Sequence, residues 1–363
     1  MSILSQLVEF SNKYGSDSSL VLAGGGNTSA KENGMVYVKG SGTRLATITA
    51  EQFVRMDLSA LNAIFKNTYP EDDDEREALV LKDLMLARMP GEGTKRPSVE
   101  TMLHGIFEQT FVLHLHPTLV NGLTCSKGGR ELAEKLLGTD IIWIDACKPG
   151  YILSAICFEK MQEYKLAKGK PADIVLLQNH GIFIAGNTVC ELGSKLENVM
   201  NKLTAALLPA YSGDAVECDG SVACKIAALC GAEVLHIGTP AAARLTMSKE
   251  SACAVLSPFT PDHIVYCKAY PLWIEDASRL SEEVSAYKAK HGFAPRVIAV
   301  KGKGIYCAGQ DEKQAKTVEM LFNDAIGIAE YSRSFGGPLC MSEQLTDFIV
   351  NWEVESYRSS QNK

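Results

Sequence analysis

The hydrophobic positions of this chain form short apolar runs with helical patterns between them. Such runs are typical of buried or half-buried strands, and they occur at residues 111–115, 141–144, 174–177, 234–237, 264–267 and 297–300. A further strand is predicted at Met35–Lys39. Helices and strands that are mixed along the whole chain predict an α/β fold.

Helical patterns occupy the stretches between these runs. The first ten residues space their apolar side chains like an amphipathic helix. Further helices are predicted at residues 101–109 and from about Val189 onward, and the acidic run at residues 71–77 fits the solvated start of another helix.

The length of 363 residues is too great for one typical domain and suits two. A polar stretch at residues 211–214 follows the long helix near Val189 and is the best candidate for a linker. We therefore expect one domain at residues 1–213 and a second at residues 214–363.

An internal repeat indicates that the two domains are related. Residues 174–186 align without a gap with residues 297–309, and a helical pattern of similar length follows each segment. In this alignment Lys303 stands opposite His180, so we expect the second domain to be a diverged copy without the metal-binding histidines of the first. A weaker match of the flanking segments gives two further pairs: His116 with Thr260, and His114 with Pro258.

Composition and charge narrow the function. A net charge of -7 and a pI near 5.6 argue against nucleic acid or an anionic membrane as the main partner. Eleven cysteines without a CxxC pair indicate reduced thiols rather than a disulfide framework. The sequence shows neither a signal peptide nor an apolar stretch of the ~18 residues that a membrane span needs. We expect a cytoplasmic protein.

Two histidines lie two residues apart in the predicted strand at 111–115 and just beyond it. Strand alternation puts the side chains of His114 and His116 on one face, while Phe111, Leu113 and Leu115 point into the core. Two adjacent imidazoles suit a metal ion, but two hydrogen-bonded structural histidines would explain the pair equally well.

A third histidine, His180, ends the strand at 174–177 and lies in the tight turn at 178–181. Three histidines leave one coordination position open, which is typical of a catalytic zinc site. The sequence therefore predicts one zinc ion per chain at His114, His116 and His180. The other histidines are expected to be structural or surface residues: His104, His236, His263 and His291.

Two glycine-rich loops, at residues 23–29 and 39–43, could bind an anion through backbone N–H groups. Their spacing fits neither a dinucleotide-binding fingerprint nor a P-loop. Taken alone, each is more simply a turn.

Glu100 stands just before the predicted helix at 101–109, where a carboxylate usually caps the helix. The alternative role of Glu100 is proton transfer.

Taken in order, these motifs resemble the class II aldolase/adducin family, which includes fuculose- and rhamnulose-phosphate aldolases. The resemblance covers about residues 5–210 and rests on five segments: 25–29, 39–43, 97–100, 114–117 and 178–181. Residues 260–263 and 271–273 resemble the extended aldolase part of bifunctional rhamnulose-1-phosphate aldolase/lactaldehyde dehydrogenase proteins. The chain is expected to stop before any dehydrogenase domain.

The resemblance implies an α/β/α sandwich around a mainly antiparallel sheet, in a homo-oligomer that is commonly a tetramer. It assigns the metal to the three histidines and the catalytic acid/base to Glu100. Val99 stands where many relatives have a second serine, which weakens one phosphate contact. The residues that the resemblance assigns to substrate or phosphate binding are Gly26, Asn27, Ser41, Gly42 and Ser98.

The implied function is that of a zinc-dependent lyase of carbohydrate metabolism. Such an enzyme cleaves a ketose 1-phosphate, like rhamnulose or fuculose phosphate, to dihydroxyacetone phosphate and an aldehyde. The same scaffold serves pentulose-phosphate 4-epimerases and sugar-phosphate dehydratases, so both stay open as alternatives. A non-catalytic adducin-like binding protein is a third alternative, against which the three histidines and Glu100 count.

Overall fold

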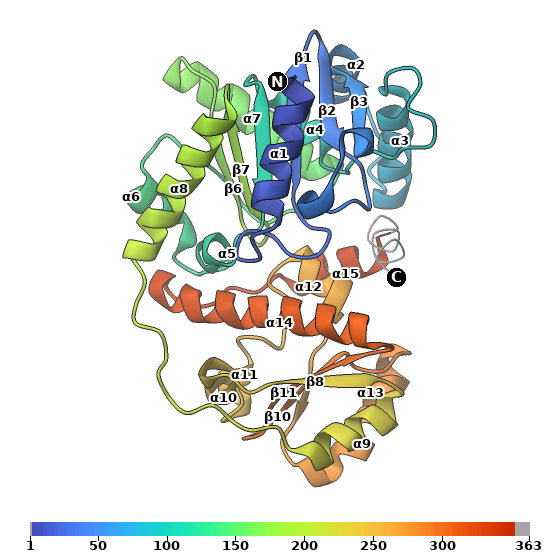
Figure 1. Ribbon diagram of the computed structural model, residues 1–363, viewed down its shortest axis with the longest axis vertical. Coiled ribbons are helices and arrows are strands. Elements are labelled where there is room, and N and C mark those ends of the chain that lie inside the picture. Colours follow the sequence, from blue (N-terminus) through green and yellow to red (C-terminus); the bar gives the residue numbers. More distant parts are fainter. Residues whose placement is uncertain (1, 353–363) are drawn as a thin grey trace. The chain divides into compact units, whose positions relative to one another are not determined.

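The computed structural model describes residues 2–352, and in these the chain divides into two compact units. One unit comprises the residues up to Val120, Arg130–Ala205 and Trp352, and the other comprises Asn121–Gly129 and Ala206–Asn351. Within the described residues the first unit holds a seven-stranded sheet and the second a four-stranded sheet. Figure 1 shows the helices and strands of each unit. Within residues 2–352, every helix is too short or too polar to cross a bilayer.

The first sheet has the strand order β3-β2-β1-β4-β7-β6-β5. Every neighbouring pair is antiparallel except β5 and β6, which are parallel. The mainly antiparallel sheet is therefore confirmed. Its strands are β1 (Asn27–Glu32), β2 (Met35–Lys39), β3 (Phe53–Asp57), β4 (Phe111–Leu115), β5 (Ile142–Ile144), β6 (Ile174–Leu177) and β7 (Gly181–Gly186).

Helices cover both faces of this sheet, which confirms the predicted α/β/α sandwich. The helices α1 (Ile3–Gly15) and α8 (Val189–Ala205) contact β1 and β7 on one face. Four helices cover the other face: α2 (Leu58–Ala63), α3 (Asp73–Leu86), α4 (Thr101–Ile106) and α7 (Tyr151–Lys168). The remaining helices of this stretch are α5 (Thr118–Thr124), α6 (Gly129–Leu137), and the 3-10 turns η1 (Leu45–Thr47), η2 (Ala50–Gln52) and η3 (Ile64–Lys66).

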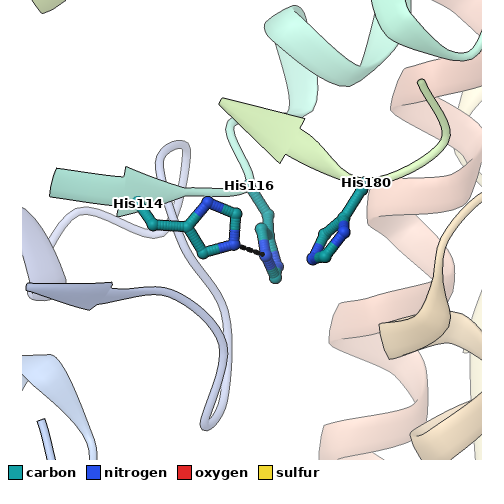
Figure 2. Close-up of side chains that lie close together, drawn as sticks. All are labelled: His114, His116 and His180. Atoms are coloured by element: carbon teal, nitrogen blue, oxygen red, sulfur yellow. Dashed lines mark hydrogen bonds between the residues drawn. The ribbon is translucent and has the colours of Figure 1, made fainter. Parts of the chain in front are cut away.

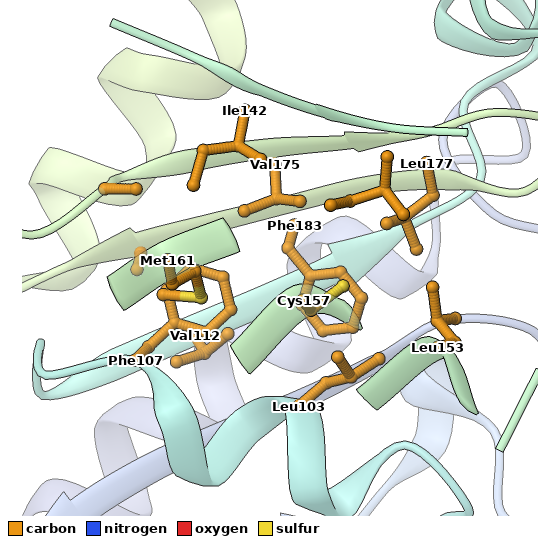
Figure 3. Close-up of a cluster of buried hydrophobic side chains, with 13 residues drawn as sticks. Leu103, Phe107, Val112, Ile142, Leu153, Cys157, Met161, Val175, Leu177 and Phe183 are labelled. Carbon is orange, nitrogen blue, oxygen red and sulfur yellow. The ribbon is translucent and has the colours of Figure 1, made fainter. Parts of the chain in front are cut away.

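A buried apolar cluster fixes the strands that carry the predicted metal ligands (Figure 3). Val112 of β4 and Phe183 of β7 pack there against Leu103 of α4 and against Leu153 and Cys157 of α7. A fully buried side chain of this size contributes about 1.5–3 kcal/mol. The ends of β4 and β7 are thus held rigidly next to each other.

The second sheet has the order β8-β11-β10-β9. Its strands are β8 (Glu233–Ile237), β9 (Leu272–Ile274), β10 (Val297–Val300) and β11 (Gly304–Gly309). The helices are α9 (Gly220–Cys230), α10 (Pro240–Leu245), α11 (Lys249–Ala252), α12 (Pro261–Cys267), α13 (Leu280–His291), α14 (Glu312–Ser332) and α15 (Glu343–Asn351), with 3-10 turns η4 (Ala277–Arg279) and η5 (Arg333–Phe335).

One predicted strand is wrong. The apolar run at residues 264–267 forms the end of the helix α12. Thr260 adopts an extended conformation at the N-cap and Pro261 occupies the first helical turn, which is the usual start of a helix. Every residue of α12 is buried, so its apolar run has no polar interruptions that would show a helical period.

The two sheets share a topology. The order β8-β11-β10-β9 repeats β4-β7-β6-β5, and each contains one parallel pair at its edge, β9 with β10 and β5 with β6. The hairpins have the same register, because Leu177 pairs with Gly181 and Val300 pairs with Gly304. The repeat seen in the sequence is therefore also a repeat of strand pairing.

The correspondence extends to side chains on the edge strands. Trp143 of β5 donates its indole N–H to Asp145, and Trp273 of β9 donates to Glu275. We infer that the second unit is a diverged copy of one half of the first. In the described residues, the second sheet has no strands that correspond to β1, β2 and β3.

Candidate metal centre

Three histidine rings converge at one end of the first sheet (Figure 2). His114 lies on β4, His116 follows that strand, and His180 lies in the turn between β6 and β7. The Nε2 atoms of His114 and His116 are 2.9 Å apart, and one ring nitrogen from each of the three residues lies within 4.8 Å of the other two. Among the described residues, no other group of histidine, cysteine or acidic side chains converges in this way.

The orientation of His114 suits metal binding. Its Nδ1 lies 3.0 Å from the carbonyl oxygen of Ile182, so Nδ1–H donates there and Nε2 is left for a metal. The side chain is fully buried, and burial lowers the pKa of His114 to about 4. His114 is therefore a neutral imidazole at neutral pH, which is the form that binds a metal.

Backbone conformation places the other two rings. Asn179 has a positive φ of 57°, which asparagine tolerates better than most residues, and it turns the chain so that His180 precedes β7. Gly181 then permits close packing, because a Cβ at this position would lie 2.4 Å from the Leu115 carbonyl oxygen and 2.8 Å from His116 Cδ2. The turn thus requires a glycine to keep His116 and His180 side by side.

Glu100 occupies the N-cap position of α4, but its side chain makes no capping hydrogen bond. Its Oε1 lies 3.2 Å from His114 Nε2 and 3.1 Å from His180 Nε2. Burial alone would raise the pKa of Glu100, but the contacts of its carboxyl group with the His114 and His180 side chains hold this pKa well below its usual range. The carboxylate therefore serves the histidine cluster rather than the helix.

Asn27 and Ser98 contact this carboxylate. Asn27 Nδ2 donates to Glu100 Oε2 at 2.5 Å and to Ser98 Oγ at 3.2 Å, and the backbone N–H of Glu100 donates to Ser98 Oγ at 3.3 Å. His104, which the sequence placed outside the site, is fully buried and bonds both Asn27 and Ser29. The signal that could have found it is the i, i+4 spacing of Glu100 and His104 at the start of one helix.

The two glycine-rich loops lie next to the segment that carries Ser98. The backbone N–H of Ser41 donates to the Arg96 carbonyl oxygen at 2.8 Å, and Gly42 follows with a positive φ of 82°. Lys39, a buried lysine that was not predicted as a site residue, donates from Nζ to the carbonyl oxygens of Gly24 and Gly26, each at 3.0 Å. Lys39 thereby ties the first loop to the start of the second.

The register of the second sheet corrects part of the sequence alignment. The strand β8 pairs with β11 as β4 pairs with β7, so His236 stands in the place of His114 and Gly238 in the place of His116. The alignment of Thr260 with His116 was therefore wrong, and the copy retains one histidine. A short polar match had suggested that alignment, and strand pairing overrides it.

In the place of His180 the second unit carries Lys303, as predicted. Its ammonium group lies 2.5 Å from Asp219 Oδ2, and Asp219 is the N-cap of α9 just as Glu100 is the N-cap of α4. The pair of His180 and Glu100 thus corresponds to an ion pair in the copy. This pair holds the pKa of Asp219 far below its ordinary value, chiefly through the Lys303 hydrogen bond.

The sequence profile of the class II aldolase and adducin N-terminal domain matches residues 5–205, which is more than half of the chain. The chain therefore belongs to the class II aldolase and adducin family. This finding confirms the resemblance seen in the motifs. Enzymes of this family are generally metal-dependent, and the three converging histidines of this chain agree with that property.

This chain is also similar to individual proteins. The uncharacterized oxidoreductase YuxG of Bacillus subtilis (strain 168) is 24% identical, over a match that covers 97% of this chain and 58% of YuxG. The chain thus spans little more than half the length of that relative. An N-terminal class II aldolase domain from Thermoplasma acidophilum is 27% identical, with a TM-score of 0.48 over 56% of this chain and 93% of that chain. For L-fuculose-1-phosphate aldolase from Thermus thermophilus the identity is 16% and the TM-score 0.37, over 56% and 94%.

Proposed function

We propose that this chain is a zinc-dependent aldolase that cleaves a ketose 1-phosphate to dihydroxyacetone phosphate and an aldehyde. The observation that carries the proposal is the contact of Glu100 Oε1 with the Nε2 atoms of His114 and His180, at 3.2 and 3.1 Å. A proton-transfer group thus lies directly beside the metal ligands. Membership of the class II aldolase and adducin family supports the same reading.

The histidines fit a zinc ion. Tetrahedral zinc with Zn–N bonds of ~2.0–2.1 Å needs donor atoms about 3.4 Å apart. The 2.9 Å between His114 Nε2 and His116 Nε2, and the 4.8 Å limit for all three donors, bracket that value. When bound, the ion would act as a Lewis acid toward the carbonyl and hydroxyl oxygens of the substrate.

Glu100 performs the proton transfer in this proposal. In the condensing direction, its carboxylate removes a proton from the hydroxyl-bearing carbon next to the carbonyl of dihydroxyacetone phosphate. The electron pair of that C–H bond forms an enediolate, which attacks the aldehyde carbon, and the resulting alkoxide takes up a proton. Cleavage runs through the same steps in reverse. General acid–base catalysis of this kind typically contributes ~10²–10⁴-fold.

The substrate phosphate is proposed to bind between the two loops. Gly26 and Gly42 would offer backbone N–H groups there, and Ser41 and Ser98 would offer hydroxyls, which suit a phosphate oxygen. The Asn27 side chain is already engaged, because its amide N–H groups donate to Glu100 and Ser98. We therefore assign the Asn27 side chain to the carboxylate rather than to the phosphate.

The test measures proton exchange and carbon–carbon cleavage separately. The purified full chain with zinc is incubated with dihydroxyacetone phosphate in D₂O, and loss of the carbon-bound proton is followed by NMR. Glu100→Gln should retain zinc but lose this exchange, whereas Glu108→Gln, which removes an exposed carboxylate paired with Lys165, should not. Wild-type protein that holds zinc but exchanges no proton would refute the proposal.

Product analysis with a set of sugar phosphates decides among the rival reactions. An aldolase releases dihydroxyacetone phosphate and an aldehyde, a 4-epimerase returns a phosphate ester of the same mass, and a dehydratase releases water. Wild-type protein without metal and without turnover would instead support an adducin-like binding protein. Only the release of dihydroxyacetone phosphate and an aldehyde supports the proposed reaction.

A further inference from the structure

A buried chain of hydrogen bonds ends on Glu100. His104 Nδ1 lies 2.7 Å from Ser29 Oγ, and its Nε2 makes a short contact with Asn27 Oδ1. Asn27 Nδ2 then donates to Glu100 Oε2 at 2.5 Å. Ser29, Asn27 and His104 are each at most 3% exposed, so water does not compete for these bonds.

The donor and acceptor of every hydrogen bond between Ser29 and Glu100 can be assigned. Burial holds the pKa of His104 well below its usual range, so its ring is neutral and carries one N–H. Asn27 Oδ1 can only accept a hydrogen bond, so the N–H must be at Nε2 of His104. Nδ1 then accepts from the Ser29 hydroxyl. The amide of Asn27 is consequently fixed with its N–H₂ group toward Glu100.

The opposite arrangement is unfavourable. If the Asn27 amide were flipped, its oxygen would face the Glu100 carboxylate, and two acceptors would meet without a proton between them. His104 would then have to carry its proton on Nδ1 and donate to Ser29. The tautomer of His104 therefore reports the orientation of the Asn27 amide.

We propose that His104 is a positioning residue for the reaction: through Asn27 it holds Glu100 Oε2, so that Oε1 faces the histidine cluster. This proposal rests on the proposed function, because it takes Glu100 as the proton-transfer group. Both ring nitrogens of His104 are engaged by Ser29 and Asn27, so its effect on the reaction would pass through Asn27. Its removal should slow the proton transfer without releasing the metal.

Two substitutions separate this role from simple packing. Glutamine places its amide N–H near the position of His104 Nε2 and can still donate to Asn27, whereas asparagine reaches only the position of Nδ1. We expect His104→Asn to lower kcat about 10- to 100-fold with little change in KM, as loss of a transition-state interaction does. His104→Gln should retain most of the activity.

The control is His291→Asn, which changes a histidine that packs among Tyr270, Tyr287 and Phe293. All variants are checked for zinc by elemental analysis and for folding by urea denaturation. Equal activity of His104→Asn and wild type, or equal loss in His104→Gln and His104→Asn, would overturn the proposal.

A measurement without substrate tests the chain of bonds directly. In protein labelled with ¹⁵N-histidine, the signals that disappear in His104→Gln belong to His104 and should show the Nε2–H tautomer. An Nδ1–H tautomer would overturn the positioning role even if the enzyme is an aldolase. Conversely, the Nε2–H tautomer could be found in protein that exchanges no proton of dihydroxyacetone phosphate. The hydrogen bonds from Ser29 to Glu100 would then stand, but the proposed function would be refuted, and with it the effect of His104 on catalysis.

Discussion

Replacing Gly181 by alanine inserts a methyl group into a tight contact between β4 and β7. The new Cβ would lie 2.4 Å from the Leu115 carbonyl oxygen and 2.8 Å from His116 Cδ2. The first neighbour is backbone and cannot rotate aside, so β4 and β7 must separate there. Since His116 and His180 flank the insertion, the metal site should loosen together with the fold.

The expected loss has two parts. Overpacking of this kind costs about 1–3 kcal/mol of the free energy of unfolding, and this part should appear in metal-free protein. Zinc at 100 times its Kd stabilises the folded protein by ~2.7 kcal/mol, and a tenfold weaker affinity leaves ~1.4 kcal/mol. Relative to wild type, the free energy of unfolding of the variant should therefore fall by about 1 kcal/mol more with zinc than without zinc.

Urea denaturation with and without zinc measures both parts, with EDTA present in the metal-free series. Gly220→Ala is the matched control, because a Cβ on this first residue of α9 meets no atom within 4 Å and should change the stability little. The reasoning would be refuted by a Gly181→Ala protein with wild-type stability and a wild-type increment from zinc.

Three further predictions follow from the site. Elemental analysis should find close to one zinc per chain; His180→Ala should remove most of it and His263→Ala should not, and two metals per chain would contradict the single site. Glu100→Gln should keep the metal and lose about 10²–10⁴-fold in rate, with little change in melting temperature; an unchanged rate would leave Glu100 without a catalytic role. In metal-free protein, the free energy of unfolding should fall as the pH drops from 6.5 to about 4, by up to about 1.4 kcal/mol per pH unit for His114, because unfolded His114 binds a proton that the buried ring excludes. Urea denaturation across this pH range should show the slope, and His114→Ala should reduce it.

Much of the candidate metal centre could be predicted because its residues stand at strand ends. Alternation along β4 sets the spacing of His114 and His116, and the apolar run of β6 ends just before His180. That these strand ends meet depends on β4 and β7 being neighbours, which periodicity does not reveal. In the sequence, only the family resemblance indicated that the three histidines meet. In the structure, the pairing of β4 with β7 brings them together.

Other features had no readable pattern. The strand β1 consists of Asn27–Glu32, which is largely polar, yet its first four residues are buried because the strand lies between β2 and β4. His104 gave no signal beyond its i, i+4 spacing from Glu100, and only the folded structure shows its bonds to Ser29 and Asn27. Buried polar side chains that bond one another are difficult to predict, because each is an exception to the hydrophobic pattern.

The second unit shows which features the chemistry requires beyond the shared sheet. It repeats four strands of the first sheet in the same order and retains His236 in the place of His114. In the described residues it has no counterpart of β1, β2 and β3, whose loops and side chains contact Glu100 and the proposed phosphate site. The ammonium group of Lys303 pairs with the Asp219 carboxylate. It therefore occupies the place in which a metal cation would otherwise balance the charge of that carboxylate. Because both side chains are partly exposed, solvent screens this ion pair, and it should contribute little to stability. A lysine in this place would repel a metal cation, so the proposed reaction would depend on the histidines and glycine-rich loops of the first unit rather than on the sheet that the two units share.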